Sequence, residues 1–247
     1  MKKYGLIGFH LSHSFSKQYF QDKFTREKIA ASYELFELEN LEGLIPLIEN
    51  QSLNGLNVTI PFKQSVIPYL DEINDVAKET GAVNCINIIN NNGKKYLIGY
   101  NTDVYGFKQS IKPFLESNHE RALIFGTGGA SKAVAYVLKE IGIDFLFVSR
   151  DPSKAANTIA YQDLNEYAIK AHKLIINTTP LGMYPNTETS PDIPYSALTA
   201  DHLLYDLVYN PGETVFLKKG KEKGAVTMNG ISMLHLQAEK SWEIFNS

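Results

Sequence analysis

The chain carries the stretch Arg121-Ala-Leu-Ile-Phe-Gly-Thr-Gly-Gly-Ala-Ser131 near its middle, and its fold class follows from this stretch. The first five residues form a short apolar run that predicts a buried strand, and the glycines after them predict a tight turn. Residues 132–141 then repeat apolar side chains on one face, as an amphipathic helix does. A strand, a glycine-rich turn and a helix in this order predict an α/β unit with a parallel sheet.

The glycine-rich turn also has the form of a dinucleotide-binding loop. Gly126 permits the tight turn, and Gly128 lets the backbone approach a pyrophosphate. The first N–H groups of the helix attract the negative charge of that pyrophosphate. Ser131 stands where the common motif has a third glycine, so the match is a variant. The alternative is that these glycines form only a turn, but the strand before them and the helix after them favour a cofactor site.

The end of the next predicted strand bears on which nucleotide this loop binds. NAD-binding units usually place Asp or Glu there to accept from the ribose 2′-hydroxyl, whereas a cation suits a 2′-phosphate. Here Ser149 and Arg150 follow the strand, with Lys154 one helical turn further, which favours NADP. Asp151 lies beside them and keeps NAD open, and a solvated loop is the alternative interpretation of Arg150 and Lys154.

Other short apolar runs predict further strands of the same unit. They lie at residues 145–148, 173–176 and 203–207. Four strands of this kind favour a doubly wound sheet. The loops at residues 177–183 and 206–211 would lie at the carboxyl ends of strands, where open α/β sheets bind ligands, although each alone could be a turn set by Pro and Gly.

The first hundred residues alternate strands and helices, which predicts a second, largely parallel sheet. The strands are expected at residues 4–8, 33–38 and 55–60, and the helices at residues 16–28 and 41–49. Apolar runs at residues 83–89 and 96–100 flank Asn90-Asn-Asn-Gly93, a turn typical of an antiparallel hairpin, so this sheet should be mixed. The segment 231–245 predicts an amphipathic helix that returns to the first unit.

These patterns predict two α/β domains, an N-terminal mixed-sheet substrate domain and a Rossmann-like dinucleotide-binding domain. The first would comprise residues 1–103 with residues 230–247, and the second residues 104–229.

The composition is that of an ordinary globular protein. A net charge of -3 with 44% hydrophobic and 21% charged residues predicts no general attraction to nucleic acid or to anionic membranes. We find neither an apolar run of about 18 residues nor a signal-peptide pattern, so we expect a cytoplasmic protein. The six histidines lack metal-ligand spacing, so no metal is expected. The single cysteine, Cys85, lies in an apolar run as a small buried filler.

A second stretch, Gly55-Leu-Asn-Val-Thr-Ile-Pro-Phe-Lys63, puts polar groups and one cation on an apolar strand. Asn57 and Thr59 share one face of the strand, and that face can hold a polar ligand. Pro61 ends the strand, so Lys63 should lie on a loop or the first turn of a helix. An ammonium there can meet a substrate hydroxyl, but a half-buried strand with a solvated lysine is equally open from these nine residues.

Together the motifs resemble the shikimate dehydrogenase family, whose members reduce 3-dehydroshikimate with NADPH in aromatic biosynthesis. The matching elements follow the family order over nearly the whole chain: Ser12-x-Ser14, Asn57-Val-Thr-x-Pro-x-Lys63, Gly81-Ala-Val-Asn84, Asn101-Thr-Asp103, Gly126-x-Gly-Gly-Ala130, Asn177-x-Thr-Pro-x-Gly-Met183, Tyr209-Asn-Pro211 and Asn229-Gly-Ile-x-Met-Leu-x-x-Gln237. The family usually has Asn-Arg-Thr and a second Arg where this chain has Ser149-Arg150-Asp151 and Lys154, and that departure bears on the strength of its NADP preference.

The resemblance implies a set of site residues. Lys63 and Asp103 would form the catalytic pair, with Lys63 as general acid and base. The implied substrate-binding residues are Ser12, Ser14, Asn57, Thr59, Lys63, Asn84, Asp103, Tyr209 and Gln237. The implied cofactor-binding residues are Gly126, Thr127, Gly128, Gly129, Ala130, Ser149, Arg150, Lys154, Thr178, Thr179, Pro180, Met183, Leu207, Gly230 and Met233. For the two serines, a helix cap is the alternative.

Three rival functions stay open at this level. A quinate/shikimate dehydrogenase of broader specificity that also uses NAD is favoured by Asp151. A methylenetetrahydrofolate dehydrogenase is opposed by the paired serines and by the Asn-Thr-Asp motif. An inactive NADP-binding regulator is opposed by the presence of both Lys63 and Asp103. A monomer and a homodimer are equally open, and the expected partner is a small-molecule substrate.

Overall fold

The computed structural model describes residues 1–11, 14–154 and 156–247. Their packing divides the chain into unit 1, residues 1–102 with 238–247, and unit 2, residues 103–237. Both units are α/β, and the return of the last helix to the first unit is confirmed. That helix, α8 (Ile231–Phe245), is itself divided between the units after Gln237, whereas we expected the second domain to end at residue 229. The division by function stays a prediction.

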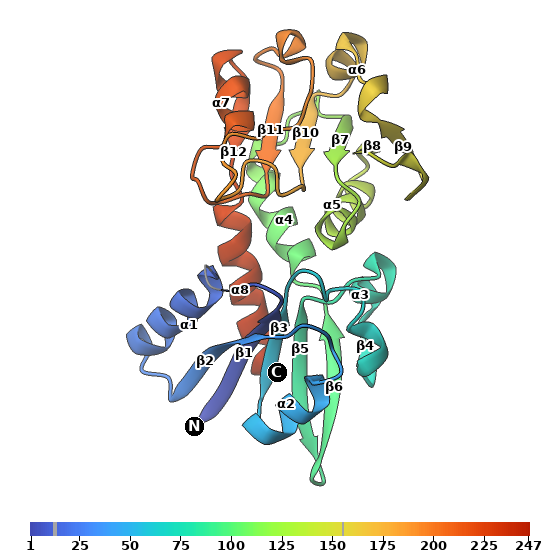
Figure 1. Ribbon diagram of the computed structural model, residues 1–247. Helices are drawn as coiled ribbons and strands as arrows, with labels where there is room; N and C mark the ends of the chain where they lie inside the picture. Colours follow the sequence, from blue (N-terminus) through green and yellow to red (C-terminus); the bar gives the residue numbers. More distant parts are fainter. Residues whose placement is uncertain (12–13, 155) are drawn as a thin grey trace. The chain divides into compact units, whose positions relative to one another are not determined.

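Unit 1 contains a six-stranded mixed sheet in the order β2-β1-β3-β5-β6-β4 (Figure 1). Its strands are β1 (Lys2–Gly8), β2 (Ala31–Glu37), β3 (Gly55–Val58), β4 (Glu72–Ile73), β5 (Cys85–Asn91) and β6 (Lys94–Tyr100). Strands β1, β2 and β3 are parallel, whereas β5 runs antiparallel to β3 and β6, so the predicted mixed sheet and hairpin are confirmed. Strand β4 was not predicted from the sequence, because two residues are too few to show an alternation of apolar and polar side chains.

Helices cover both faces of this sheet. They are α1 (Phe15–Arg26), α2 (Leu44–Gln51), α3 (Asp75–Thr80) and the part of α8 from Ala238 onward, with a short 3-10 helix, η1, at Ile67–Tyr69. On one face Ile7 and Leu56 pack with Ile48 of α2. On the other, Tyr4 and Cys85 pack with residues of α1 and α8. This alternation follows from the period of two along a strand, and it makes Cys85 the buried filler that the sequence predicts.

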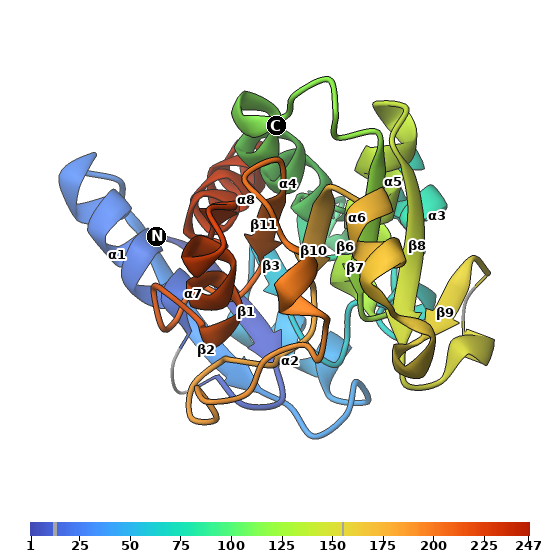
Figure 2. The ribbon, with the colours of Figure 1, turned by 90° about the horizontal axis from the view of Figure 1, so that it is seen from above.

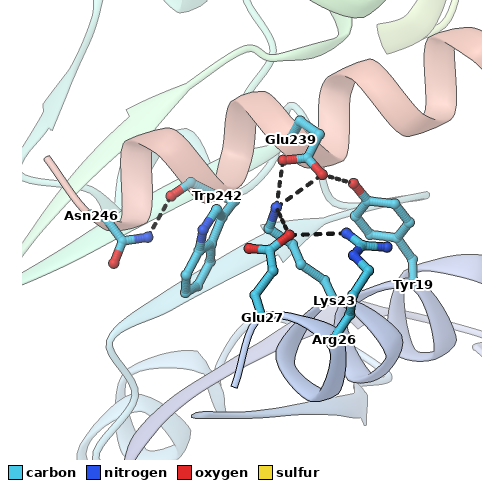
Figure 3. A network of polar contacts seen from close by, with 7 residues as sticks. All are labelled: Tyr19, Lys23, Arg26, Glu27, Glu239, Trp242 and Asn246. Carbon is cyan, nitrogen blue, oxygen red and sulfur yellow. Dashed lines mark hydrogen bonds and ion pairs between the residues drawn. The ribbon is translucent and has the colours of Figure 1, made fainter. Parts of the chain in front are cut away.

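An ion-pair network joins α1 to α8 inside unit 1 (Figure 3). Lys23, buried on α1, donates to both carboxylate oxygens of Glu239 at 2.8 and 3.1 Å and to Glu27 at 3.1 Å. Tyr19 also donates to Glu239. Burial would raise the pKa of Glu239, but the bonds from Lys23 and Tyr19 outweigh it and lower that pKa. The network therefore holds α1 to α8 most strongly while Glu239 is ionised.

Unit 2 contains six parallel strands in the order β12-β11-β10-β7-β8-β9 (Figure 1). Figure 2 shows the strands from β11 to β9 from above. They are β7 (Arg121–Phe125), β8 (Asp144–Ser149), β9 (Thr158–Ala160), β10 (Leu174–Asn177), β11 (Leu203–Asp206) and β12 (Val226–Met228). This order is that of a doubly wound dinucleotide-binding sheet. The order in which strands are added to the sheet reverses between β7 and β10, and such sheets bind ligands at that point. Strands β9 and β12 were missed, because three residues are too few to show a pattern.

Both faces of the second sheet are also covered. The helices are α4 (Asp103–Ile111), α5 (Gly129–Glu140), α6 (Glu166–Ala171), α7 (Val215–Glu222) and the part of α8 up to Gln237, with 3-10 helices η2 (Lys112–Phe114), η3 (Pro152–Lys154), η4 (Tyr161–Asp163) and η5 (Tyr195–Ala197). Leu123 and Ile175 pack with Ile169 of α6 on one face. On the other, Tyr205 meets Phe107 of α4 edge to face at 5.2 Å. Burial on both sides explains why these strands read as continuous apolar runs.

Candidate active site

Lys63 lies in the turn that follows β3, as the proline at position 61 predicts. The turn is anchored at both ends. Val83 N donates to the carbonyl oxygen of Lys63 at 2.7 Å, and Thr59 N donates to the carbonyl oxygen of Ile7 at 2.9 Å. Phe62 is buried beside it, whereas Lys63 keeps part of its surface exposed. The backbone therefore presents the ammonium group from a braced turn.

Asn57 holds three neighbours rather than facing an open surface. Its Oδ1 accepts from the hydroxyl of Tyr33 at 2.8 Å. Its Nδ2 donates to the carbonyl oxygen of Asn84 at 3.2 Å and to Oγ of Ser241 at 2.8 Å. Because both amide hydrogens are used inside unit 1, the side chain ties β2, β3 and α8 together. A direct contact of Asn57 with substrate stays a prediction.

Asn84 is buried in the same network. Its Oδ1 accepts from Thr102 N at 2.7 Å, and its Nδ2 donates to Thr102 Oγ1 at 3.0 Å. Thr102 Oγ1 lies 3.2 Å from Oγ of Ser241, so Ser241 links Asn57 to the residue before Asp103. Sequence reasoning missed Thr102 and Ser241. The available signal for Ser241 was its place four residues after Gln237, on the same face of the predicted helix.

Ser14 caps helix α1, with its Oγ accepting from Ser16 N at 3.3 Å. The cap interpretation of Ser14 is therefore confirmed, and its role in carboxylate binding stays a prediction. Ser12, the other serine of the predicted pair, lies outside the described residues.

The glycine-rich turn of unit 2 fits a pyrophosphate. Gly126 has a φ of +105°, which favours glycine, and a Cβ there would lie 2.8 Å from Thr178 Oγ1. Gly128 precedes α5, and among the described residues none caps this helix with a side chain or would come within 4 Å of a Cβ at Gly128. Residues 127–130 thus offer backbone N–H groups and the positive end of a twelve-residue helix to an anion.

The loop after β10 lies at the same edge of the sheet, since Asn177 pairs with Phe125. Thr178 binds the carbonyl oxygen of Phe125 through both its N, at 3.0 Å, and its Oγ1, at 2.6 Å. Thr179 binds Oδ1 of Asn177 through its N, at 3.0 Å, and its Oγ1, at 2.6 Å. Thr178 and Thr179 therefore lie beside Gly126, in a loop at the carboxyl end of a strand, as the sequence pattern predicts for this loop.

The loop after β8 holds the residues expected to choose between NADP and NAD. Ser149 ends β8, and its Oγ accepts from Asp151 N at 3.2 Å. The Asp151 carboxylate accepts from Ser153 N at 3.1 Å and from Ser153 Oγ at 2.6 Å, which makes it a local brace of the turn η3. Arg150 is exposed, and Lys154 ends the turn. Asp151 is thus engaged in its own loop.

The remaining predicted residues lie in the loops after β10 and β11 and at the starts of α8 and α4, all in unit 2. Gly230 lies against the backbone of Leu207, because a Cβ there would clash with the Leu207 carbonyl oxygen. Met233 on α8 is buried, whereas Met183 is exposed. Of the others, Tyr209 is half-buried and Gln237 donates from its Nε2 to the Leu234 carbonyl oxygen at 3.0 Å. Asp103 is buried and is the first residue of α4.

The described residues contain neither a candidate membrane-spanning helix nor a candidate metal site. No helix in the part of the chain that the structure describes is long and apolar enough to cross a membrane. Among residues 1–11, 14–154 and 156–247, no group of three His, Cys, Asp or Glu side chains could hold a metal ion.

Comparison with known proteins identifies the family. Residues 6–86 match the family model described as the shikimate dehydrogenase substrate binding domain. A shikimate dehydrogenase (NADP(+)) from Clostridium beijerinckii is 41% identical over 261 residues, which cover 99% of this chain and 92% of that protein. The chain belongs to the shikimate dehydrogenase family. The resemblance that the motifs indicate is therefore confirmed.

Solved structures of the family share the fold of the whole chain. The enzyme from Thermus thermophilus, solved in complex with NADP(H) and shikimate, matches with a TM-score of 0.86 and 28% identity over 99% of this chain and 93% of that one. A quinate dehydrogenase from Corynebacterium glutamicum, solved in complex with NAD, matches with a TM-score of 0.87 and 29% identity over 99% of this chain and 93% of that one. The two-domain, Rossmann-like fold class is confirmed.

Proposed function

We propose that this chain catalyses the reversible, NADPH-dependent reduction of 3-dehydroshikimate to shikimate in the biosynthesis of chorismate and the aromatic amino acids. The observation that carries the proposal is the 41% identity, over 99% of the chain, to a shikimate dehydrogenase (NADP(+)). The lysine in the turn after β3 and the start of α5, which no described side chain caps, support the proposal.

Lys63 acts as the general acid in the reductive direction. Its ammonium donates a proton to the C3 oxygen of 3-dehydroshikimate as that oxygen gains negative charge, and it takes the proton back in the reverse reaction. Asp103 orients the lysine and bonds a neighbouring hydroxyl of the substrate. The apparent pKa values of the reaction therefore belong to the pair and not to either residue alone. A compact, carboxylated substrate with three oxygens on its ring needs many small donors and acceptors around it, which matches the serines, threonine and amides predicted to bind it.

The residues of unit 2 hold the nucleotide. Bound NADPH supplies the hydride that becomes the new hydrogen on C3. The turn at residues 126–130 and the start of α5 bind its pyrophosphate, and Ser149, Arg150 and Lys154 bind its 2′-phosphate. An exposed arginine beside a serine hydroxyl fits a phosphate better than it fits a ribose hydroxyl.

The test incubates the purified chain with shikimate and either NADP or NAD. The absorbance of the reduced nicotinamide measures the rate of each reaction. We expect turnover with NADP to exceed turnover with NAD by a wide margin. Comparable turnover with both cofactors, together with turnover of quinate, would favour the broader quinate/shikimate dehydrogenase. No turnover with either cofactor would overturn the proposal.

The cellular setting belongs to the same proposal. We place the reaction in the cytoplasm, with a small-molecule substrate and with neither nucleic acid nor membrane as partner. A monomer and a homodimer stay equally compatible with it, and sedimentation of the purified chain distinguishes them.

A further inference from the structure

Asp206 is a fully buried carboxylate at the carboxyl end of β11, inside unit 2. Its Oδ1 accepts from Asn177 Nδ2 at 2.9 Å and from Val208 N at 3.0 Å. Its Oδ2 accepts from Thr214 Oγ1 at 2.6 Å. One side chain therefore bonds to the last residue of β10, to the loop after β11 and to the N-cap of α7.

Two of these contacts, with Asn177 and with Val208, lead to residues predicted to bind the nucleotide or the substrate. Asn177 uses its Oδ1 to hold both the N and the Oγ1 of Thr179. Val208 lies between Leu207 and Tyr209, and its carbonyl oxygen accepts from Gly230 N at 3.1 Å. The carboxylate is thus the common point from which the two loops at this edge of the sheet are held.

A charge at this place is costly for the fold. Burial raises the pKa of Asp206 to about 6, although the bonds from Thr214, Val208 and Asn177 act to lower it. A neutral amide of the same shape could fill the same volume, and buried ionised groups often add little to stability. Groups with such shifted pKa values are concentrated at functional sites.

The groups around the carboxylate do not titrate in the same range. Asn177 at the end of β10, the Val208 amide after β11 and Thr214 at the N-cap of α7 are neutral donors. The ionisable group that senses Asp206 from η5 is Tyr195, and burial raises its pKa to about 12, so it stays neutral at working pH. A change in this region near neutrality therefore reports on Asp206.

We propose that Asp206 is a positioning residue for the nicotinamide nucleotide: its ionised carboxylate holds the loops at residues 177–183 and 206–214 in the arrangement that binds the cofactor. This inference rests on the proposed function, because the loops are assigned to cofactor binding there. Asp206 acts through Thr179 and through the backbone around Val208, and it need not touch the nucleotide itself.

The experiment measures the dissociation constant of NADPH by titration calorimetry between about pH 5 and pH 8, for the wild type and for Asp206→Asn, across the range in which such a carboxylate titrates. The 2′-phosphate of NADPH also ionises at about pH 6, as phosphate esters do, but equally with both proteins. The ratio of the two dissociation constants therefore isolates Asp206. We expect the variant to bind about as well as the wild type near pH 5 and about tenfold more weakly at pH 8, a usual size for coupling between two sites.

Asp201→Asn is the matched control. Asp201 precedes the amino end of the same strand, β11, and lies 3.8 Å from Lys173 on the surface. Its substitution removes the same charge at the amino end of the strand, opposite the carboxyl end where Asp206 lies. The NADPH affinity of this control should follow the wild type at every pH.

Thr214 provides a second test that does not depend on removing the carboxylate. Thr214→Val keeps the shape but removes the bond to Oδ2, so the pKa of Asp206 should rise and the midpoint of the pH dependence should move upward. Thr214→Ser keeps the hydroxyl and should restore the midpoint of the wild type. This pair decides the question even if Asp206→Asn does not fold.

The outcomes separate this inference from the proposed function. A ratio of dissociation constants that stays constant with pH, or equal midpoints in Thr214→Val and Thr214→Ser, would overturn the role of Asp206. A change of tenfold in the KM of shikimate with unchanged NADPH binding would also do so. If the wild type binds NADPH but does not turn over shikimate, the proposed function fails, and the binding ratio still decides Asp206. If the wild type does not bind NADPH, both fail.

Discussion

Individual polar residues of unit 1 divide into those that hold the structure and those that can meet a ligand. The Asn57 amide uses both of its hydrogens on Asn84 and Ser241, and Ser14 caps a helix. Lys63 differs, because its backbone is anchored in the turn after β3 while its side chain keeps an exposed part. The residue types of the site could be predicted from the sequence. Their internal partners could not, because Ser241 and Thr102 meet Asn57 and Asn84 only through the fold.

Replacement of Lys63 by alanine should remove the proton donor while leaving the turn in place. We expect kcat to fall by roughly 10²- to 10⁴-fold, with a much smaller change in the KM of shikimate. Initial rates at saturating NADP measure both constants. Lys78→Ala is the control, because Lys78 is an exposed lysine of the same unit paired with Asp75 at 3.2 Å. An unchanged kcat in the Lys63 variant would remove Lys63 from the mechanism.

Asp151 should weaken the binding of NADP by its charge. Its carboxylate is held by Ser153, next to Arg150, so it opposes the 2′-phosphate without needing to bond a ribose. Asp151→Thr should lower the KM of NADP by about two- to fivefold, the size that up to about 1 kcal/mol from exposed charges allows. The KM of NAD should change less. Asp163→Asn, which removes an exposed carboxylate of the same unit, serves as the control. A fall in the KM of NAD alone would show that Asp151 had been repelling the unphosphorylated cofactor instead.

At the scale of elements, the success of sequence reasoning depends on length. Residues 121–125 and 231–245 were predicted with the bounds that the structure has for β7 and α8. Strands β4, β9 and β12 have two or three residues, so their place is set by the neighbours that they pair with rather than by any pattern of their own. The loops proposed to bind the nucleotide could be located from the sequence because each follows a strand that is long enough to recognise.

The network between α1 and α8 should make stability depend on pH. The pKa of Glu239 lies below its ordinary value of 4.5, so its contribution is present above that pH and is lost as the pH falls through the lowered value. Glu239→Gln should therefore melt below the wild type at neutral pH, and the gap should narrow in acid. Since Glu239 is partly exposed, we expect up to about 1 kcal/mol, or about 2–4 °C.

Thermal melts at several pH values measure this gap. Glu243→Gln is the control on the same helix, since Glu243 pairs with Lys240 at 2.6 Å on the surface, and its gap should be small at every pH. A gap for Glu239→Gln that widens in acid would mean that the network is not held by the ionised carboxylate.

For the whole molecule, the notable feature is that unit 2 is inserted into unit 1. The chain leaves unit 1 after Thr102 and returns to it at Ala238. The two-unit plan was predictable because the strand and helix pattern restarts near residue 121. The position within α8 at which the chain passes from unit 2 to unit 1 was not predictable. An uninterrupted amphipathic helix has no sequence signal at the residue where its packing partner changes.

Phe245 should be essential to the core of unit 1 although it lies at the far end of the chain. It is buried, it stacks on Tyr4 at 5.0 Å, and Gly55 leaves room for its ring. Phe245→Ala should destabilise the protein by about 3–5 kcal/mol, the usual range for a buried phenylalanine. Melting measures this loss. Phe114→Ala, at an exposed phenylalanine, should have little effect. Equal melting of both variants would show that residues 238–247 add little to the core.

Helix α8, drawn in red in Figure 1, also affects the order in which the two units can be completed during translation. Domains generally fold as units while the chain is being made, beginning at the amino end. Here every residue of unit 2 must be translated before Ala238 and Phe245 reach the aromatic cluster around Tyr4. The unit whose translation begins first is therefore completed last, and the apolar face that α8 covers lacks this cover until residues 238–245 have been made.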